Sequence, residues 1–372
     1  MFRSILPRLA VLIALAQVFT NACAAADSSD PTEHAADFIA HDFRFSEGTV
    51  FPELRIHYVT LGTPQRDAHG DIANAVLLLH GTTGTGKAFL TPLMRKELFA
   101  AGEPLDTRRY FIVIPDGLGR GGSSKPSDGM RTRFPHYGYG DVVEADHRLL
   151  VDGLRVRHLK LVLGTSMGGM QTWMWGERYP GMADALMPIA SQPIAMAGRN
   201  WLWRQMIVGA IRSDPGWQDG NYTTPPTQWT RVMPVFTLIT GNAARMQEQA
   251  PDRAAATRLT ESIVTDAARS DPNDVLYWIE SSWDYDPEPN LGAIRGRLFA
   301  INFADDLINA TDLGVMQRLI GKVPQGRYVE MPETAQSYGH QTLAHPEVWK
   351  PYLIQLMTGT NGTNGTNGTD GT

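Results

Sequence analysis

The feature that most constrains the fold is the segment at 161–171, where an apolar run ends in the pattern G-x-S-x-G centred on Ser166. A helix-compatible segment follows at 171–177 and stops before a tyrosine–proline pair. Strand, sharp turn and helix in this order are typical of a nucleophile elbow, which lifts a serine hydroxyl out of a sheet. Gly164 and Gly168 fit the crowding of strand against helix at such a turn. The pattern therefore predicts that Ser166 is a nucleophile.

The segments around this elbow predict a mostly parallel sheet. Continuous apolar runs at 75–80, 110–115 and 159–163 are typical of strands buried on both faces, and a helical pattern at 142–154 separates the last two. A fourth run at 185–190 is weaker, because Pro188 cannot donate to a strand ladder. Residues 37–62 favour antiparallel strands. We therefore expect the first part of an α/β core at 37–190, with helices on both faces of the sheet.

The composition and the periodicity of the chain change after residue 190. Tryptophan and methionine become frequent, helical periodicity replaces the strand runs, and the next convincing core strand is at 298–303. We expect a helical lid inserted at 191–294, with the core resuming at 295–357. Most lid aromatics should pack between lid helices, and some should line the mouth of a pocket. Exposed lid aromatics would suit a homodimer.

Both ends of the chain differ from this core. Residues 1–26 carry Arg3 and Arg8, an apolar stretch at 9–19 and small residues beside Cys23, which together predict a cleaved export signal. The apolar stretch is shorter than the roughly 20 residues that span a bilayer, so no membrane insertion is expected after cleavage. Lipid anchoring through Cys23 is the less favoured alternative, because the residues before it match a lipobox poorly. Residues 358–372 repeat Asn-Gly-Thr and predict a flexible tail.

Composition excludes some partners. The chain has a formal net charge of -6 and no basic tract beyond its first residues, which argues against nucleic acid as a partner. No spacing of histidine or cysteine indicates a metal site. The glycine-rich segment at 81–87 lacks the phosphate-binding pattern, because Ala88 follows Lys87. We therefore expect a small-molecule substrate and no cofactor or metal.

A serine hydroxyl needs a base, and the base needs an orienting carboxylate. After an elbow of this kind, the acid and then the histidine should follow the serine along the chain. His340 lies after the predicted last strand at 327–331, where Gly339 allows the backbone to turn it inward. Asp305 and Asp306 both follow the predicted strand at 298–303, and counting from the strand end does not separate them.

The same scaffold predicts where the oxyanion would bind. One donor should be the backbone N–H of Met167, the residue after the nucleophile. The second should come from the loop after the strand that ends at His80, where the N–H of Thr82 is the natural choice.

Several segments match a known pattern, at 116–127, 166–171, 178–180, 214–217, 305–307 and 338–340. In these segments the chain resembles the α/β-hydrolase superfamily and, within it, the homoserine O-acetyltransferase-like branch. The resemblance implies an acyl-serine intermediate and transfer of the acyl group to an acceptor. The acid of this branch tends to sit in a D-x-L-F-P context, which places it at Asp305, with Asp306 as the alternative. Residues 308–309 depart from F-P. The branch also uses a lid arginine for the carboxylate of homoserine, and Arg204 is the nearest candidate.

These observations favour a periplasmic or secreted serine hydrolase or esterase that acts on a small ester. The family's acetyl donor, acetyl-CoA, is a cytosolic metabolite, whereas this chain carries an export signal. Acyl transfer to a small alcohol is the alternative. A binding protein that kept only the fold is a third interpretation, and the intact serine, acid and histidine argue against it.

Overall fold

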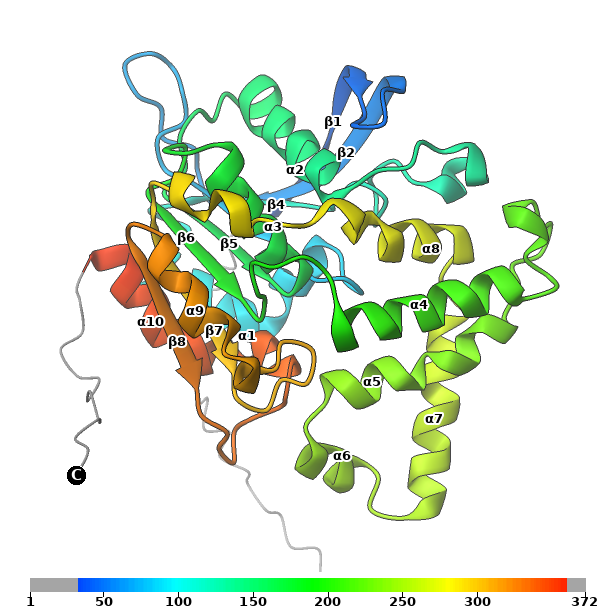
Figure 1. Cartoon of the computed structure of the whole chain (residues 1–372). Helices are drawn as coiled ribbons and strands as arrows, with labels where there is room; N and C mark the ends of the chain where they lie inside the picture. The colour runs from blue at the N-terminus through cyan, green and yellow to red at the C-terminus, as the bar shows by residue number, and fades with distance from the viewer. Residues whose placement is uncertain (1–32, 360–372) are drawn as a thin grey trace, which may run out of the picture. The chain divides into compact units, whose positions relative to one another are not determined.

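The computed structural model describes residues 33–359 (Figure 1). The predicted export signal at 1–26, Cys23 and nearly all of the predicted tail lie outside the described residues. Between residues 33 and 359, none of the helices is long and apolar enough to cross a membrane.

Eight strands form one sheet in the order β1-β2-β4-β3-β5-β6-β7-β8. The first two strands, β1 and β2, pair antiparallel, as does β2 with β4, and all other neighbours are parallel. The expected mostly parallel α/β sheet is therefore confirmed. The strand bounds are β1 Glu33–Arg44, β2 Val50–Leu61, β3 Ala75–Leu79, β4 Phe111–Pro115, β5 Leu161–Thr165, β6 Ala185–Ile189, β7 Arg297–Phe303 and β8 Gly326–Met331.

The strand that contains a proline lies in the interior of the sheet. β6 keeps its full register with β5, where Pro188 lies opposite Gly164. On the other side, its pairing with β7 joins Leu186 to Leu298 and resumes only at Ile189, opposite Ile301. The missing N–H of Pro188 thus falls where this ladder is interrupted.

Helices cover both faces of the sheet. On one face α2 (Tyr139–Arg148), α3 (Met167–Arg178) and α9 (Val315–Leu319) share a hydrophobic core with the strands. On the other face the short α1 (Pro92–Met94), the π-helical turn after it and α10 (Pro346–Thr358) do the same. These two layers pack against opposite sides of each strand because successive strand residues point to opposite faces.

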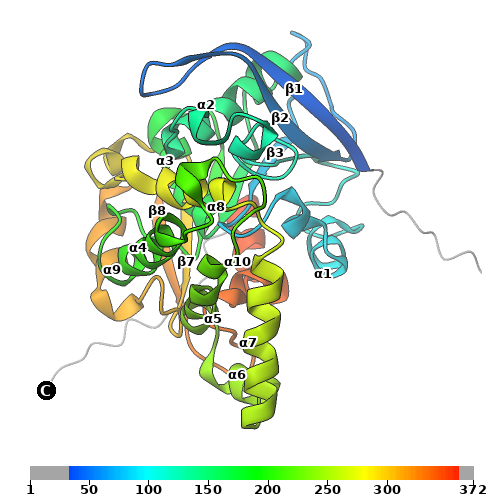
Figure 2. The same cartoon turned by 90° about the vertical axis from the view of Figure 1, so that its right-hand side faces the viewer.

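The chain between β6 and β7 is helical and has its own small core. Its helices are α4 Gly198–Ser213, α5 Pro234–Thr240, α6 Ala243–Gln249, α7 Arg253–Ala267 and α8 Pro272–Glu280. Trp203, Trp217 and Trp229 are buried there together with aliphatic residues of α4 and α8. Figure 2 shows α5, α6 and α7 grouped away from the sheet. Trp283 is 59% exposed, and the expected homodimer stays a prediction.

Candidate active site

Ser166 stands in a strained turn between β5 and α3. Its backbone angles are φ 55° and ψ -114°, a region that a residue with a Cβ rarely adopts. Two hydrogen bonds hold it there. The Ser166 N–H donates to the Ile189 carbonyl at 2.8 Å, and the Met170 N–H donates to the Ser166 carbonyl at 2.9 Å. The turn therefore presents the serine hydroxyl beyond the carboxyl end of β5.

The two glycines of the elbow are required because a side chain at either position would clash with neighbouring backbone atoms. A Cβ at Gly164 would lie 2.0 Å from the carbonyl oxygen of Gly168. A Cβ at Gly168 would lie 2.0 Å from the carbonyl oxygen of Leu79, the last residue of β3. Backbone crosses backbone at both places, and no side-chain movement could relieve either clash.

The structure brings Ser166 and His340 together from segments far apart in the sequence. His340 Nε2 lies 2.8 Å from Ser166 Oγ, and His340 Nδ1 lies 2.7 Å from Asp306 Oδ2. His340 and Asp306 are both buried. Gly339 has φ +63°, and a Cβ there would lie 2.8 Å from the carbonyl of Gly241 in the lid, so only glycine fits this approach. Serine, histidine and carboxylate thus form one hydrogen-bonded chain.

The carboxylate in this chain is Asp306, so the expectation that Asp305 contacts His340 is wrong. Asp306 points inward because Asn309 and Ile308 hold it: Oδ1 accepts both their backbone N–H groups, and Oδ2 accepts the Asn309 amide. The residues that depart from the F-P pattern are therefore those that fix the acid. An asparagine three residues after Asp306 was the sequence signal that could have separated the two carboxylates.

Asp305 lies beside the site and has other hydrogen-bond partners than Asp306. Its Oδ2 accepts the Gly339 N–H at 2.7 Å and the Asn242 side-chain amide at 2.8 Å. Asn242 caps the first turn of α6 through its other side-chain atom, by accepting the N–H groups of Ala244 and Arg245. Asp305 therefore joins the lid to the loop that carries His340.

The environment of Asp306 favours its ionised form. Burial, the largest influence, would raise the pKa of this carboxyl. The charge of His340 and the hydrogen bonds from His340 and Asn309 outweigh burial and hold the pKa below its ordinary value. An ionised Asp306 can orient the imidazole and stabilise the imidazolium that forms during proton transfer.

The two predicted oxyanion donors belong to residues that adjoin Ser166. Met167 is the first residue of α3, so its N–H has no acceptor within the helix. Thr82 lines the same small cavity as Ser166. The loop before Thr82 also runs close to the serine, because a Cβ at Gly81 would lie 3.4 Å from the Ser166 Cβ. This geometry suits a pair of backbone donors for an oxyanion.

A buried histidine, which the sequence reasoning did not select, organises this loop. His80 Nδ1 donates to the Gly81 carbonyl at 2.9 Å, and His80 Nε2 accepts the Gly117 N–H at 3.0 Å. The ring also stacks on Trp278 of the lid, whose Nε1 donates to the Thr82 carbonyl. Burial, the main cause, lowers the pKa of His80 to about 4. His80 is therefore a neutral connector between the loop at 81–82 and the loop after β4.

This pKa predicts how stability depends on pH. Below pH 6.5 the unfolded chain protonates His80 and the folded chain does not, so stability falls as the pH drops from 6.5 towards 4. His80→Asn removes this loss. We expect the difference in free energy of unfolding between wild type and His80→Asn to shrink by about 2 kcal/mol from pH 7.5 to pH 5.

Urea denaturation of both proteins at the two pH values measures this change. All other titrating groups are common to the pair, so they cancel in the comparison. A difference that stays constant with pH would show that His80 titrates normally in the folded protein.

Arg204 lies beside the serine. It is buried on α4 and lines the same small cavity as Ser166. Its guanidinium donates to the Ile279 carbonyl at 3.1 Å, to Asn200 Oδ1 at 3.3 Å and to the Tyr139 hydroxyl at 3.4 Å. Within residues 33–359 it forms no salt bridge with an acidic side chain. A buried cation next to the nucleophile is thus surrounded by neutral groups.

The described residues hold no cluster of three or more histidine, cysteine, aspartate or glutamate side chains that could bind a metal ion. The chemistry that this arrangement supports is nucleophilic attack by Ser166 on an acyl group, with His340 as the base.

Comparison with known proteins agrees with this geometry. Residues 74–334 match the family described as alpha/beta hydrolase fold. The chain therefore belongs to the α/β-hydrolase fold family. Homoserine O-acetyltransferases, the branch that the sequence resembles, are among its relatives and among the solved structures that share its fold.

Two relatives illustrate the range of similarity. A probable acyltransferase of Methanothermobacter thermautotrophicus is 27% identical over 272 residues, which are 72% of this chain and 82% of that protein. The homoserine O-acetyltransferase of Thermobifida fusca is 35% identical over 193 residues, 48% of this chain and 49% of that enzyme. The chain thus spans about half the length of this homoserine acetyltransferase.

Solved structures share the fold. An acetylester hydrolase from Corynebacterium glutamicum superposes with a TM-score of 0.76 at 19% identity, over 87% of this chain and 96% of that one. The homoserine O-acetyltransferase from Bacillus anthracis gives a TM-score of 0.75 at 18% identity, over 87% and 97%. One fold therefore carries both a hydrolase and a transferase among the neighbours of this chain.

Proposed function

We propose that the protein is an exported serine esterase that hydrolyses small esters through an acyl-serine intermediate. The observation that carries the proposal is the continuous hydrogen-bonded chain from Ser166 Oγ through His340 to Asp306. Hydrolase or acyltransferase chemistry is common to the family, and the ester substrate and the use of water are the proposed parts.

The reaction follows from these contacts. Ser166 Oγ attacks the ester carbonyl while His340 Nε2 takes its proton, and the N–H groups of Thr82 and Met167 stabilise the oxyanion. The carbon–oxygen bond to the alcohol then breaks, and His340 returns the proton to the leaving alkoxide. Water attacks the acyl-serine in the same way, which releases the acid and restores the hydroxyl of Ser166.

Acyl transfer to a small alcohol is the second candidate, and Arg204 favours it. A buried guanidinium without a carboxylate partner, in the cavity that holds the nucleophile, would suit an acceptor that carries a carboxylate. The named homoserine acetyltransferases among the relatives agree with this alternative.

The two reactions differ in whether the acyl group of the acyl-serine passes to water or to an added alcohol. We would follow p-nitrophenol release from p-nitrophenyl acetate by stopped flow, with water alone, with homoserine and with homoserinol, which lacks the carboxylate. Steady turnover that neither acceptor changes, with acetate as the product, supports the esterase. A burst that homoserine accelerates more than homoserinol, with O-acetylhomoserine as the product, would replace the esterase proposal by the transferase.

Export rests on residues 1–26, where a basic start, an apolar stretch and small residues follow one another. We propose that this segment is removed and that the enzyme acts in the periplasm or outside the cell. Mass spectrometry of the protein recovered from a periplasmic extract tests the point. A mature protein that begins near residue 27 supports export, and an intact N-terminus found only in the cytoplasm contradicts it.

A further inference from the structure

Ser166 lines a small space that adjoins two larger cavities, one in the lid and one of about 390 Å³ beyond Met170 and Ile308. The small space holds Ser166, Arg204 and Met170 in its wall and has a volume of about 10 Å³, roughly the space of one water molecule. The cavity in the lid has a volume of about 360 Å³, which is within the usual range for a small-molecule site. Thr82, Trp203 and Phe236 line both the small space and the cavity in the lid, so the latter adjoins the reacting centre.

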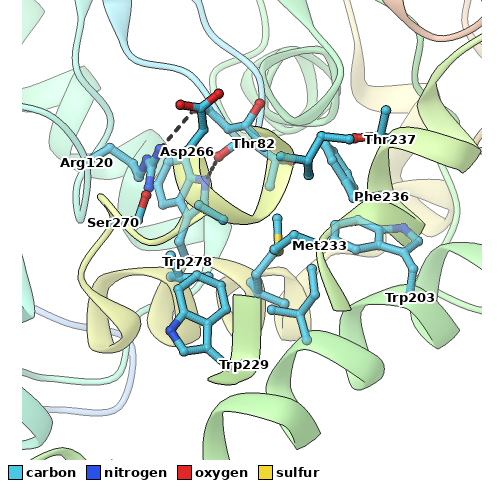
Figure 3. Close-up of a pocket in the computed structure, with 16 residues that line it drawn as sticks. Thr82, Arg120, Trp203, Trp229, Met233, Phe236, Thr237, Asp266, Ser270 and Trp278 are labelled. Carbon is cyan, nitrogen blue, oxygen red and sulfur yellow. Dashed lines mark hydrogen bonds between the residues drawn. The ribbon is translucent and has the colours of Figure 1, made fainter. Parts of the chain in front are cut away.

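The lid cavity, as we call the cavity in the lid, is mainly apolar. Figure 3 shows Trp203, Trp229, Met233 and Phe236 around it, and Trp278 at the end that adjoins Thr82. Aliphatic side chains of α4, α7 and α8 complete the wall, namely Ile207, Ile263, Ala267, Val275 and Ile279. A group that fills this cavity would gain contact with aromatic and aliphatic surface over most of its length.

The charged groups at the lid cavity are already engaged. Arg120 donates to the carbonyls of Thr83 and Gly84 at 3.1 and 3.3 Å, and its guanidinium lies over the ring of Trp278. Asp266 pairs with Arg269 at 3.3 Å near the surface. Both charged side chains that line the lid cavity therefore already have partners, and an uncharged apolar group fits the rest of its wall best.

The position of His340 indicates which half of an ester enters the lid cavity. His340 protonates the leaving alkoxide, so the alcohol half must lie on the side of His340. Phe236 and Thr237 of α5 line the lid cavity, and Gly241, the residue after α5, contacts the loop of His340 at Gly339. The lid cavity therefore lies on the leaving-group side. The acyl half lies in the small space beside Met170, and the volume of about 10 Å³ there, before the cavity beyond Met170 and Ile308 opens, favours a short acyl group.

We propose that the substrates are esters of a short acyl group, such as acetyl, with an uncharged apolar alcohol that occupies the lid cavity. This inference rests on the proposed esterase function and adds its substrate class. Attack by Ser166 breaks the bond between the acyl carbon and the alcohol oxygen. The proton of Ser166 goes to that oxygen through His340, and the apolar alcohol leaves by the lid cavity.

The first test is a matrix of esters with the full-length mature protein. Acetate, butyrate and octanoate esters of ethanol, hexanol and 2-phenylethanol would be assayed by titration of the released acid. Each fully buried methylene contributes a factor of about four, and hexanol has about four more methylenes than ethanol, so even partial burial should raise kcat/KM at least about tenfold from ethyl acetate to hexyl acetate. Among ethyl esters, kcat/KM should fall from acetate to octanoate.

A second test fills the lid cavity. Ala267, the last residue of α7, lines the cavity, whereas Ala256 on the same helix is exposed and does not. Ala267→Phe should lower the ratio of kcat/KM for hexyl acetate to that for ethyl acetate at least about tenfold. The matched variant Ala256→Phe should leave this ratio at the wild-type value.

Other outcomes overturn the inference without touching the esterase proposal. A flat response to alcohol length would show that the lid cavity does not bind the alcohol. A rise with acyl length would place the acyl chain instead in the cavity of about 390 Å³ beyond Met170 and Ile308. Should Ala267→Phe fail to fold, the wild-type matrix still decides. Absence of hydrolysis of every ester would refute the proposed function itself.

Discussion

Replacing Asp306 by asparagine should lower kcat for ester hydrolysis by about 10⁴-fold. Asparagine keeps the shape of the side chain but removes the charge that stabilises the imidazolium, and its amide can hold His340 in the wrong tautomer. Asp306 Oδ2 lies 2.7 Å from His340 Nδ1, and no other carboxylate of the described chain contacts that nitrogen.

Asp305→Asn is the matched control, one residue away. An amide oxygen can still accept the Gly339 N–H that Asp305 accepts now, so we expect kcat to fall less than about tenfold. Steady-state hydrolysis of p-nitrophenyl acetate at one pH, with thermal melts to confirm folding, measures both variants. A larger loss for Asp305→Asn than for Asp306→Asn would reverse our assignment of the acid.

Ser166→Ala should reduce turnover by 10⁴-fold or more, on the order of what loss of a catalytic serine costs elsewhere. The variant lacks the hydroxyl that forms the acyl intermediate, whereas the backbone N–H of Met167 and the packing of the elbow stay in place. The readout is the pre-steady-state burst together with intact-protein mass after brief incubation with p-nitrophenyl acetate.

Wild-type protein caught in this experiment should carry one added acetyl group, and Ser166→Ala should carry none. Turnover within tenfold of wild type in Ser166→Ala would mean that another group attacks the ester, and the proposed mechanism would fall.

Local patterns made part of this site predictable. The elbow around Ser166 could be recognised because two glycines and an apolar strand are needed within a few residues, and the contacts at Gly164 and Gly168 show why. His340 could be found because a histidine after the last strand meets the elbow at the same edge of a parallel sheet. Short-range geometry and strand order were enough for both.

The remaining parts depend on contacts that no local pattern specifies. Asp305 and Asp306 differ only in which way a turn points them, and Asn309 decides that through hydrogen bonds of its own. The stacking of His80 on Trp278 joins residues almost two hundred positions apart. Contacts between the lid and the core follow no periodic pattern in the sequence, so the sequence alone does not define the substrate cavity.

The backbone conformation that catalysis requires at Ser166 lowers the stability of the folded protein. A residue with a side chain held at φ 55° and ψ -114° raises the energy of the folded state by about 1–3 kcal/mol, whereas glycine would adopt these angles freely. The total stability of a domain is only about 5–15 kcal/mol, so this one position uses a noticeable fraction of it. A lineage selected only for robustness would be expected to lose its nucleophile first, and inactive descendants of this fold could therefore be more heat-resistant than their active parents.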